Sequence, residues 1–143
     1  MRKTNRICSL CAALVAPMLW SLPAASMMGG DGPPPCESRA CFVEAVSACK
    51  EKASYMTTTA AGARAQYVVE GPADDGRCQV GMIYMTHPQS DWTYKPLHFV
   101  LERDGDIETR LKETVADCLA GRADGNRQCS GPLLEISGAA SNQ

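Results

Sequence analysis

The sequence has no excess of basic residues. Its 143 residues include 14 Lys and Arg against 16 Asp and Glu, which gives a formal net charge of −2. Binding to nucleic acid or to an anionic membrane surface depends on clustered basic side chains. We therefore expect no nucleic acid and no membrane as partner. Hydrophobic residues are not scarce, at 45% of the chain, so we expect a folded core.

Local motifs for nucleotide binding and for nucleophilic catalysis are also missing. The sequence contains no G-x-x-x-x-G-K-[ST] phosphate loop, no G-x-G-x-x-G turn and no G-x-S-x-G nucleophile elbow. These absences predict no cofactor and no catalytic residue. They favour a binding role over an enzyme.

No apolar run reaches the ~20 residues that span a bilayer. The longest, Ile7 to Leu22, has about 16 residues and is broken by Pro17 and Ser21. Three basic residues precede it and small residues follow it at 23–26, a pattern typical of a secretory signal. We expect residues 1–25 to be removed and the protein to be exported, either to a periplasm or outside the cell.

Six cysteines remain beyond the expected signal. They are Cys36, Cys41, Cys49, Cys78, Cys118 and Cys129. An even number of cysteines in an exported chain predicts disulfides, here three of them. No two of these six have the C-x-x-C spacing of a redox motif or of a structural zinc site. We expect no bound metal.

Three disulfide pairs follow from the expected positions of the cysteines. They are Cys118–Cys129, Cys49–Cys78 and Cys36–Cys41. The first pair would close a Gly-containing turn after a helix. The second would join the inward stripe of a first helix to the inward face of a strand. The third is assigned by elimination, at the entrance of the first helix.

Hydrophobic periodicity predicts two amphipathic helices, one over 38–53 and one that begins at Ile107 after the N-cap Asp106 and stops at Gly121. Alternating residues between them predict three strands, at 64–70, 78–84 and 97–102, and residues 133–136 allow a last short strand. The order α-β-β-β-α-(β) indicates the α+β class, with a small antiparallel sheet of three to four strands. We expect a single domain over 36–137, with a flexible Gly/Pro leader at 26–35 and a frayed tail at 138–143.

The segment 87–98 is the most distinctive irregular stretch. It displays Trp92 and Tyr94 between prolines, and aromatic side chains on a loop are frequent recognition elements. We hypothesise an exported, non-catalytic binding or inhibitor-like module of unknown protein target that uses this loop, with His87 and His98 at its ends. The alternative is that Trp92 folds back onto the sheet as part of the core.

Two other hypotheses stay open. In the first, the two histidines, His87 and His98, join Glu102 in a small hydrolase or a metal-dependent enzyme, although no local spacing rule supports this. In the second, the protein is a structural component that docks through a bare sheet face. This face would carry Val68, Ile83, Met85 and Val100. The frequency with which apolar residues are buried favours core for these four positions.

Overall fold

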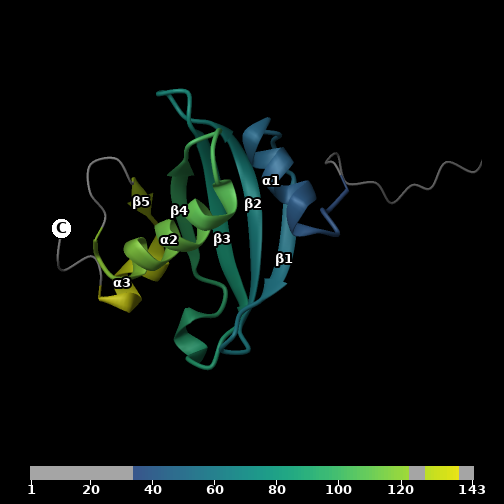
Figure 1. Cartoon of the computed structure of the whole chain (residues 1–143). Coiled ribbons are helices and arrows are strands. Elements are labelled where there is room, and N and C mark those ends of the chain that lie inside the picture. The colour runs from purple at the N-terminus through teal and green to yellow at the C-terminus, as the bar shows by residue number, and fades with distance from the viewer. Residues whose placement is uncertain (1–33, 123–127, 139–143) are drawn as a thin grey trace, which may run out of the picture.

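The computed structural model describes residues 34–122 and 128–138 (Figure 1). The elements in chain order are α1 (Arg39–Ser47), β1 (Ser54–Thr58), β2 (Arg64–Pro72), β3 (Cys78–Thr86), the 3₁₀ turn η1 (Ser90–Trp92), β4 (Pro96–Leu101), α2 (Ile107–Leu119), β5 (Cys129–Ser130) and α3 (Pro132–Ser137). The expected signal, the leader as far as residue 33 and the tail from residue 139 lie outside the described residues.

The five strands form one antiparallel sheet in the order β1-β2-β3-β4-β5, so every strand pairs with its neighbour in the sequence. The long hairpin of β2 and β3 turns through residues 73–77, where the Ala73 N–H donates to the Arg77 carbonyl oxygen at 2.9 Å. With its helices, this sheet confirms the α+β class expected from the sequence.

The first helix ends six residues before its predicted end. Cys49 and Lys52 adopt left-handed backbone conformations, with φ of 47° and 66°, which an α-helix does not contain. The chain then enters β1, a strand that the sequence did not predict. Its composition, Ser-Tyr-Met-Thr-Thr, has no clear alternation of apolar and polar residues, and at five residues it is short.

The predicted strand at 133–136 is wrong, because these residues lie in the helix α3. A short apolar run does not distinguish a strand from a buried helix by its period alone. Pro132 occupies the first turn, where a proline costs no hydrogen bond, and Gly138 ends the helix in a left-handed conformation. The last strand comes earlier, at Cys129–Ser130.

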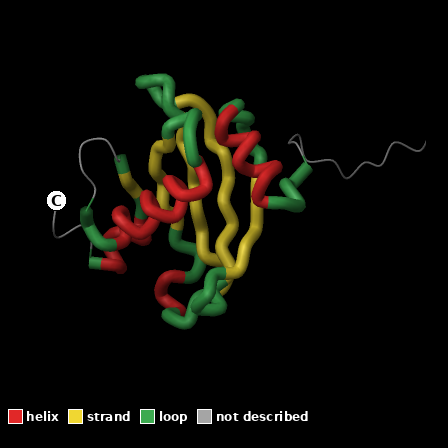
Figure 2. Tube along the Cα trace, viewed as in Figure 1, coloured by secondary structure: helices red, strands yellow, loops and turns green. Residues whose placement is uncertain are grey.

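Both long helices cover the same face of the sheet (Figures 1 and 2), where α1 contacts β1 and β3 and α2 contacts β4. Side chains from this face and from the helices make up the core, whose largest fully buried members are Phe42, Phe99, Leu97, Leu133, Val46, Val69 and Val80. In the part of the chain that the structure describes, no helix packs on the opposite face. Of the four apolar residues expected there, Val100 is buried, whereas Val68, Ile83 and Met85 are half-buried and do not belong to the core, so the expectation of core is wrong for these three.

Three disulfides tie these elements together. They are Cys36–Cys41, Cys49–Cys78 and Cys118–Cys129, with Cα–Cα separations of 5.5, 5.5 and 5.8 Å. These are the three pairs expected from the positions of the cysteines on the predicted elements, with Cys36–Cys41 assigned by elimination. The second joins the turn after α1 to the start of β3, and the third joins the end of α2 to β5.

Because of Tyr67, the stability of the fold is expected to depend on pH in the alkaline range. Its ring lies against Phe42, with centroids 6.0 Å apart, and burial raises its pKa to about 12. A tyrosine whose pKa is higher in the folded state stabilises the fold fully at pH below ~10 and loses that contribution as the pH rises toward ~12. We therefore expect Tyr67→Phe to lose less stability than the wild type between about pH 9 and about pH 11. Urea unfolding at each pH measures this, and equal losses would contradict the assignment.

Candidate functional site

The loop 87–98 places its two aromatic side chains in different environments. The Trp92 ring stacks on His87, with centroids 4.7 Å apart, and lies 6.1 Å from Tyr84. It is half-buried and packs against the core. Tyr94 is 64% exposed and has a left-handed backbone, with φ of 60°. Of the two predicted anchors, only Tyr94 projects freely into solvent.

We expect the two rings to differ in their contribution to stability. Trp92→Ala is expected to lower the free energy of unfolding by about 1–3 kcal/mol, less than a fully buried Trp because the ring is half-exposed. Tyr94→Ala is expected to change it by no more than about 0.5 kcal/mol. Urea unfolding followed by circular dichroism gives both values. Two equally small changes would contradict the packing of Trp92 on the core.

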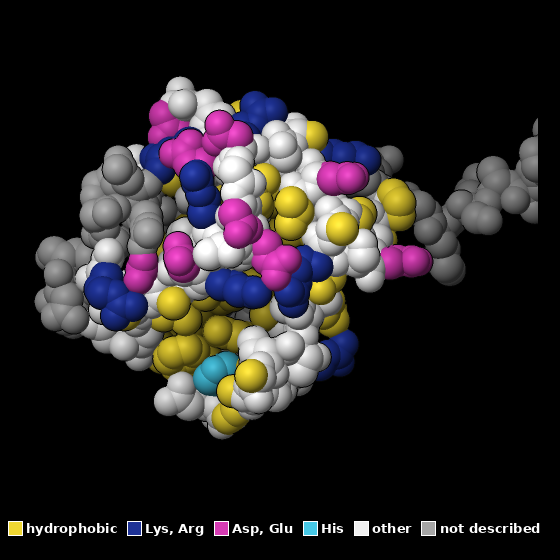
Figure 3. All heavy atoms as spheres, in the orientation of Figure 1, with side chains coloured by type: hydrophobic (Ala, Val, Ile, Leu, Met, Phe, Trp, Pro, Cys, Tyr) yellow, Lys and Arg dark blue, Asp and Glu magenta, His cyan; other side chains and the backbone are white. Residues whose placement is uncertain are grey.

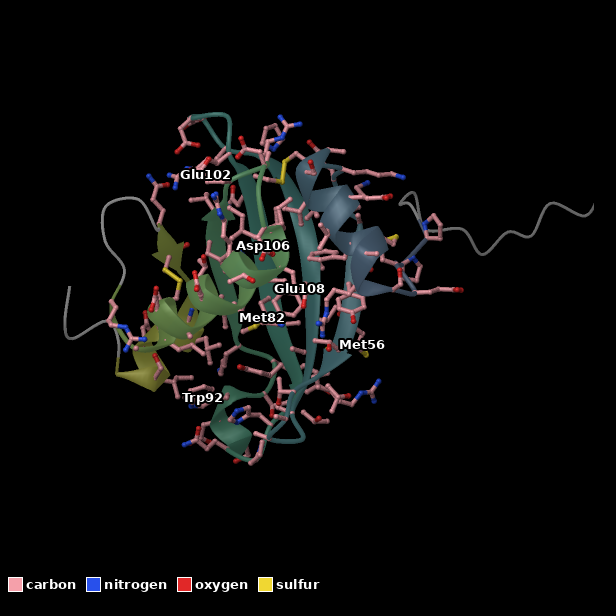
Figure 4. The ribbon with its side chains drawn as sticks, in the orientation of Figure 1. Met56, Met82, Trp92, Glu102, Asp106 and Glu108 are labelled. Carbon is pink, nitrogen blue, oxygen red and sulfur yellow. A yellow bond between two sulfur atoms is a disulfide. The ribbon has the colours of Figure 1, made fainter. Side chains whose placement is uncertain are left out.

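The three residues of the predicted enzyme site are not brought together. His87 stacks on Trp92 and contacts Tyr84 with its ring tilted. Figure 4 shows Trp92 and Glu102 at opposite ends of the sheet. His98 lies on the face of β4 opposite α1 and α2, and Glu102 follows the end of β4 and lines a hollow beside α2. Within residues 34–122 and 128–138, no three His, Cys, Asp or Glu side chains form a cluster that could hold a metal ion.

A different carboxylate contacts His98. Glu70 on β2 reaches across β3 and places its Oε1 2.7 Å from the Nδ1 of His98 on β4. Gly81 lies between them on β3, opposite both Val68 and His98 in the register. A Cβ at Gly81 would lie 2.5 Å from the Glu70 Oε1, so the absence of a side chain there allows the contact. This pair occupies the middle of the sheet.

An apolar groove runs beside this pair on the face opposite α1 and α2. We call this surface the open face and define it by Val68, Ile83, Pro96 and His98. The groove has a volume of about 190 Å³. Its lining residues are Gln66, Val68, Glu70, Gly81, Met82, Ile83, Pro96 and His98. It therefore combines aliphatic walls with one polar pair.

A second, more polar hollow of about 280 Å³ adjoins the groove at His98. Its lining includes Asp74 and Asp75 from the β2–β3 turn and Gln128 and Ser130 from the β5 region. Hydrogen bonds from Arg77, its ion-pair partner, hold the pKa of Asp75 below its usual value. The open face thus passes from an apolar groove to a carboxylate-lined end.

The side of the molecule that α1 and α2 cover carries many charged side chains. Figure 3 shows Lys, Arg, Asp and Glu side chains of both signs interspersed over the helices. Arg39 of α1 pairs with Glu108 of α2 at 2.6 Å, and Lys112 pairs with the same carboxylate at 2.9 Å. The first pair joins the two helices and the second lies within α2. Charges of alternating sign are typical of a solvated helix surface.

Sequence reasoning missed Glu70 and Gly81. Alternation along β2 places Glu70 on the same side as Val68, but the register between β2 and β4 is a property of the folded sheet.

Comparison with protein-family models, with curated proteins and with solved structures finds no match for the chain. Among the described residues, none of the helices has the length and apolar character needed to cross a membrane.

Proposed function

We propose that this protein is an exported, non-catalytic binding module that holds a protein partner on the open face of its sheet. The observation that carries the proposal is the one-sided covering of the sheet, which leaves Val68 and Ile83 half-buried beside a groove. Monomeric proteins rarely leave contiguous apolar surface uncovered, and such surface is typical of protein interfaces.

Export is supported by two independent features. Residues 1–25 have the basic start, apolar stretch and small-residue end of a secretory signal. The six cysteines beyond them are joined in three disulfides, which persist in oxidising compartments. We accordingly propose a periplasmic or secreted location.

The chemistry of the open face favours a partner with one apolar side chain next to a basic one. The groove accepts the apolar side chain, and the carboxylate of Asp74 at the adjoining hollow attracts Lys or Arg. The negative overall charge of the chain also favours a partner with a basic side chain. Without residues 1–25, eleven basic residues face sixteen acidic ones, a net charge of −5.

Panning random phage-displayed peptides on the mature protein tests this proposal. We expect the enriched peptides to pair an apolar residue with a basic one. On titration with such a peptide, the amide signals of Val68, Ile83 and His98 should shift in NMR spectra of the labelled protein. Ile83→Arg should weaken binding by at least about tenfold without lowering the melting temperature by more than a few degrees. Tyr94→Ala is the matched control and should bind as the wild type does.

Three outcomes would overturn the proposal. They are the absence of any enriched peptide, equal binding by the Ile83→Arg variant, and signal shifts confined to residues 87–94. The last outcome would assign binding to the aromatic loop that the sequence singles out.

A second candidate, a small hydrolase, is favoured by one observation. Ser130 on β5 is the register partner of His98, whose Nδ1 contacts Glu70, so a hydroxyl, an imidazole and a carboxylate follow one another across the open face. This is the order of groups in a hydrolytic triad. A fluorophosphonate probe tests it, with Ser130→Ala as the control. Failure to label the wild type would exclude this candidate.

A further inference from the structure

We infer that Cys36–Cys41 is a site of reversible thiol–disulfide exchange whose substrate is a dithiol, and that its opening releases residues 34–36 from the edge of the sheet. This inference is independent of the proposed function. It rests on the access to this disulfide, on its position at the start of α1, and on the backbone contact that Cys36 makes with β1.

Access distinguishes this disulfide from the other two. Cys41 is exposed and Cys36 is half-buried, and both line a hollow of about 330 Å³ formed with Pro34, Pro35 and residues of α1. The other bonds each include a sulfur from a fully buried residue, Cys78 or Cys118. Exchange requires a thiolate to approach a disulfide sulfur directly, and among the three disulfides Cys36–Cys41 is the one in which neither residue is buried.

The position of Cys41 also favours opening. Cys41 lies in the first turn of α1, whose N-cap is Ser38, and the partial positive charge at a helix N-terminus stabilises a thiolate. A more stable thiolate is a better leaving group in exchange. The dithiol therefore attacks the Cys36 sulfur, and Cys41 leaves as the thiolate.

The dithiol alone supplies the two electrons that the reaction requires. One of its thiolates bonds to the Cys36 sulfur as the Cys36–Cys41 bond breaks. Its second thiolate then attacks the first sulfur of the dithiol, and Cys36 leaves and takes up a proton. The protein gains two electrons and becomes a dithiol, while the substrate becomes a disulfide.

The Cys36–Cys41 disulfide holds residues 34–36 against the outer edge of β1. The Cys36 N–H donates to the Ser54 carbonyl oxygen at 2.7 Å, and Cys36 forms an isolated parallel bridge with Tyr55. β1 is one of the two edge strands, and Pro34 and Pro35 precede this contact without N–H groups of their own. Proline beside an edge strand prevents pairing with another chain. Opening the disulfide removes the covalent link that keeps this segment in place.

Graded reduction of the native, mature protein with dithiothreitol tests the inference. Free thiols are trapped by alkylation and located by peptide mass mapping. We expect Cys36 and Cys41 to be alkylated at least about tenfold faster than the other four cysteines. In the partly reduced protein, hydrogen exchange at the Cys36 amide should accelerate by at least about tenfold. The Val69 amide, bonded to the Ala53 carbonyl oxygen at 2.8 Å, serves as the internal control.

A Cys36→Ser/Cys41→Ser variant provides the second arm. It should fold, keep both remaining disulfides and reproduce the fast exchange at residue 36. Simultaneous reduction of all three bonds, or earlier reduction of Cys118–Cys129, would overturn the exchange site. Unchanged protection of the residue 36 amide would overturn the release of the edge.

Discussion

Replacing both Cys49 and Cys78 with alanine is expected to lower the free energy of unfolding by about 3–4 kcal/mol. This disulfide joins residues 29 positions apart, the widest separation of the three. The loop-closure entropy that a disulfide removes from the unfolded chain increases with that separation. Both residues also belong to the buried core, so the variant leaves a small packing defect in addition.

Chemical denaturation of the variant and the wild type measures this loss. The matched control is the Cys118→Ala/Cys129→Ala variant, whose bond joins residues 11 positions apart and whose expected loss is about 3 kcal/mol. A Cys49→Ala/Cys78→Ala variant as stable as the wild type would show that the turn after α1 is not held to β3 by this bond.

Gly131→Ala is expected to cost about 3 kcal/mol or more. Gly131 has a φ of +121°, which residues with a Cβ rarely adopt. A Cβ there would lie 2.5 Å from the Pro96 carbonyl oxygen and 3.3 Å from the Leu97 Cα, and neither backbone atom can move aside cheaply. Either β5 and α3 separate from β4 or the strand itself shifts.

Gly138→Ala separates conformational strain from the clash. Gly138 also has a positive φ, of +78°, but no atom of the residues that the structure describes lies within 4 Å of the position of its Cβ. We expect this variant to lose about 1 kcal/mol. Thermal unfolding of the two variants gives the comparison. Equal losses would contradict the close approach of Gly131 to β4.

The parts of the fold that sequence reasoning predicted are those with strong local signals. The second helix follows from its apolar stripe and from Asp106, which accepts a hydrogen bond from the Thr109 N–H at 3.0 Å as an N-cap does. The β2–β3 hairpin follows from alternation on either side of a Gly- and Asp-rich turn. By contrast, β1 and α3 are short, and their assignment depends on neighbours distant in the sequence.

The candidate site was less accessible to sequence reasoning. His98 was singled out because histidine is rare in this chain, and it does lie on the open face. Its contact with Glu70 depends on the register of three strands and on Gly81, which no local pattern reveals. The covering of one sheet face by both helices depends on how α1 and α2 pack, and the sequence left both arrangements possible.

The three disulfides are sequential, since each joins two cysteines that are neighbours among the six of the described residues, and none is interleaved with another. For the exported location that we propose, this order affects how the disulfides form during translocation. As the chain emerges from its N-terminal end, an oxidant that joins each new thiol to the one left over produces all three native bonds. Proofreading of mispaired intermediates by an isomerase is then unnecessary, and maturation requires only a supply of oxidising equivalents.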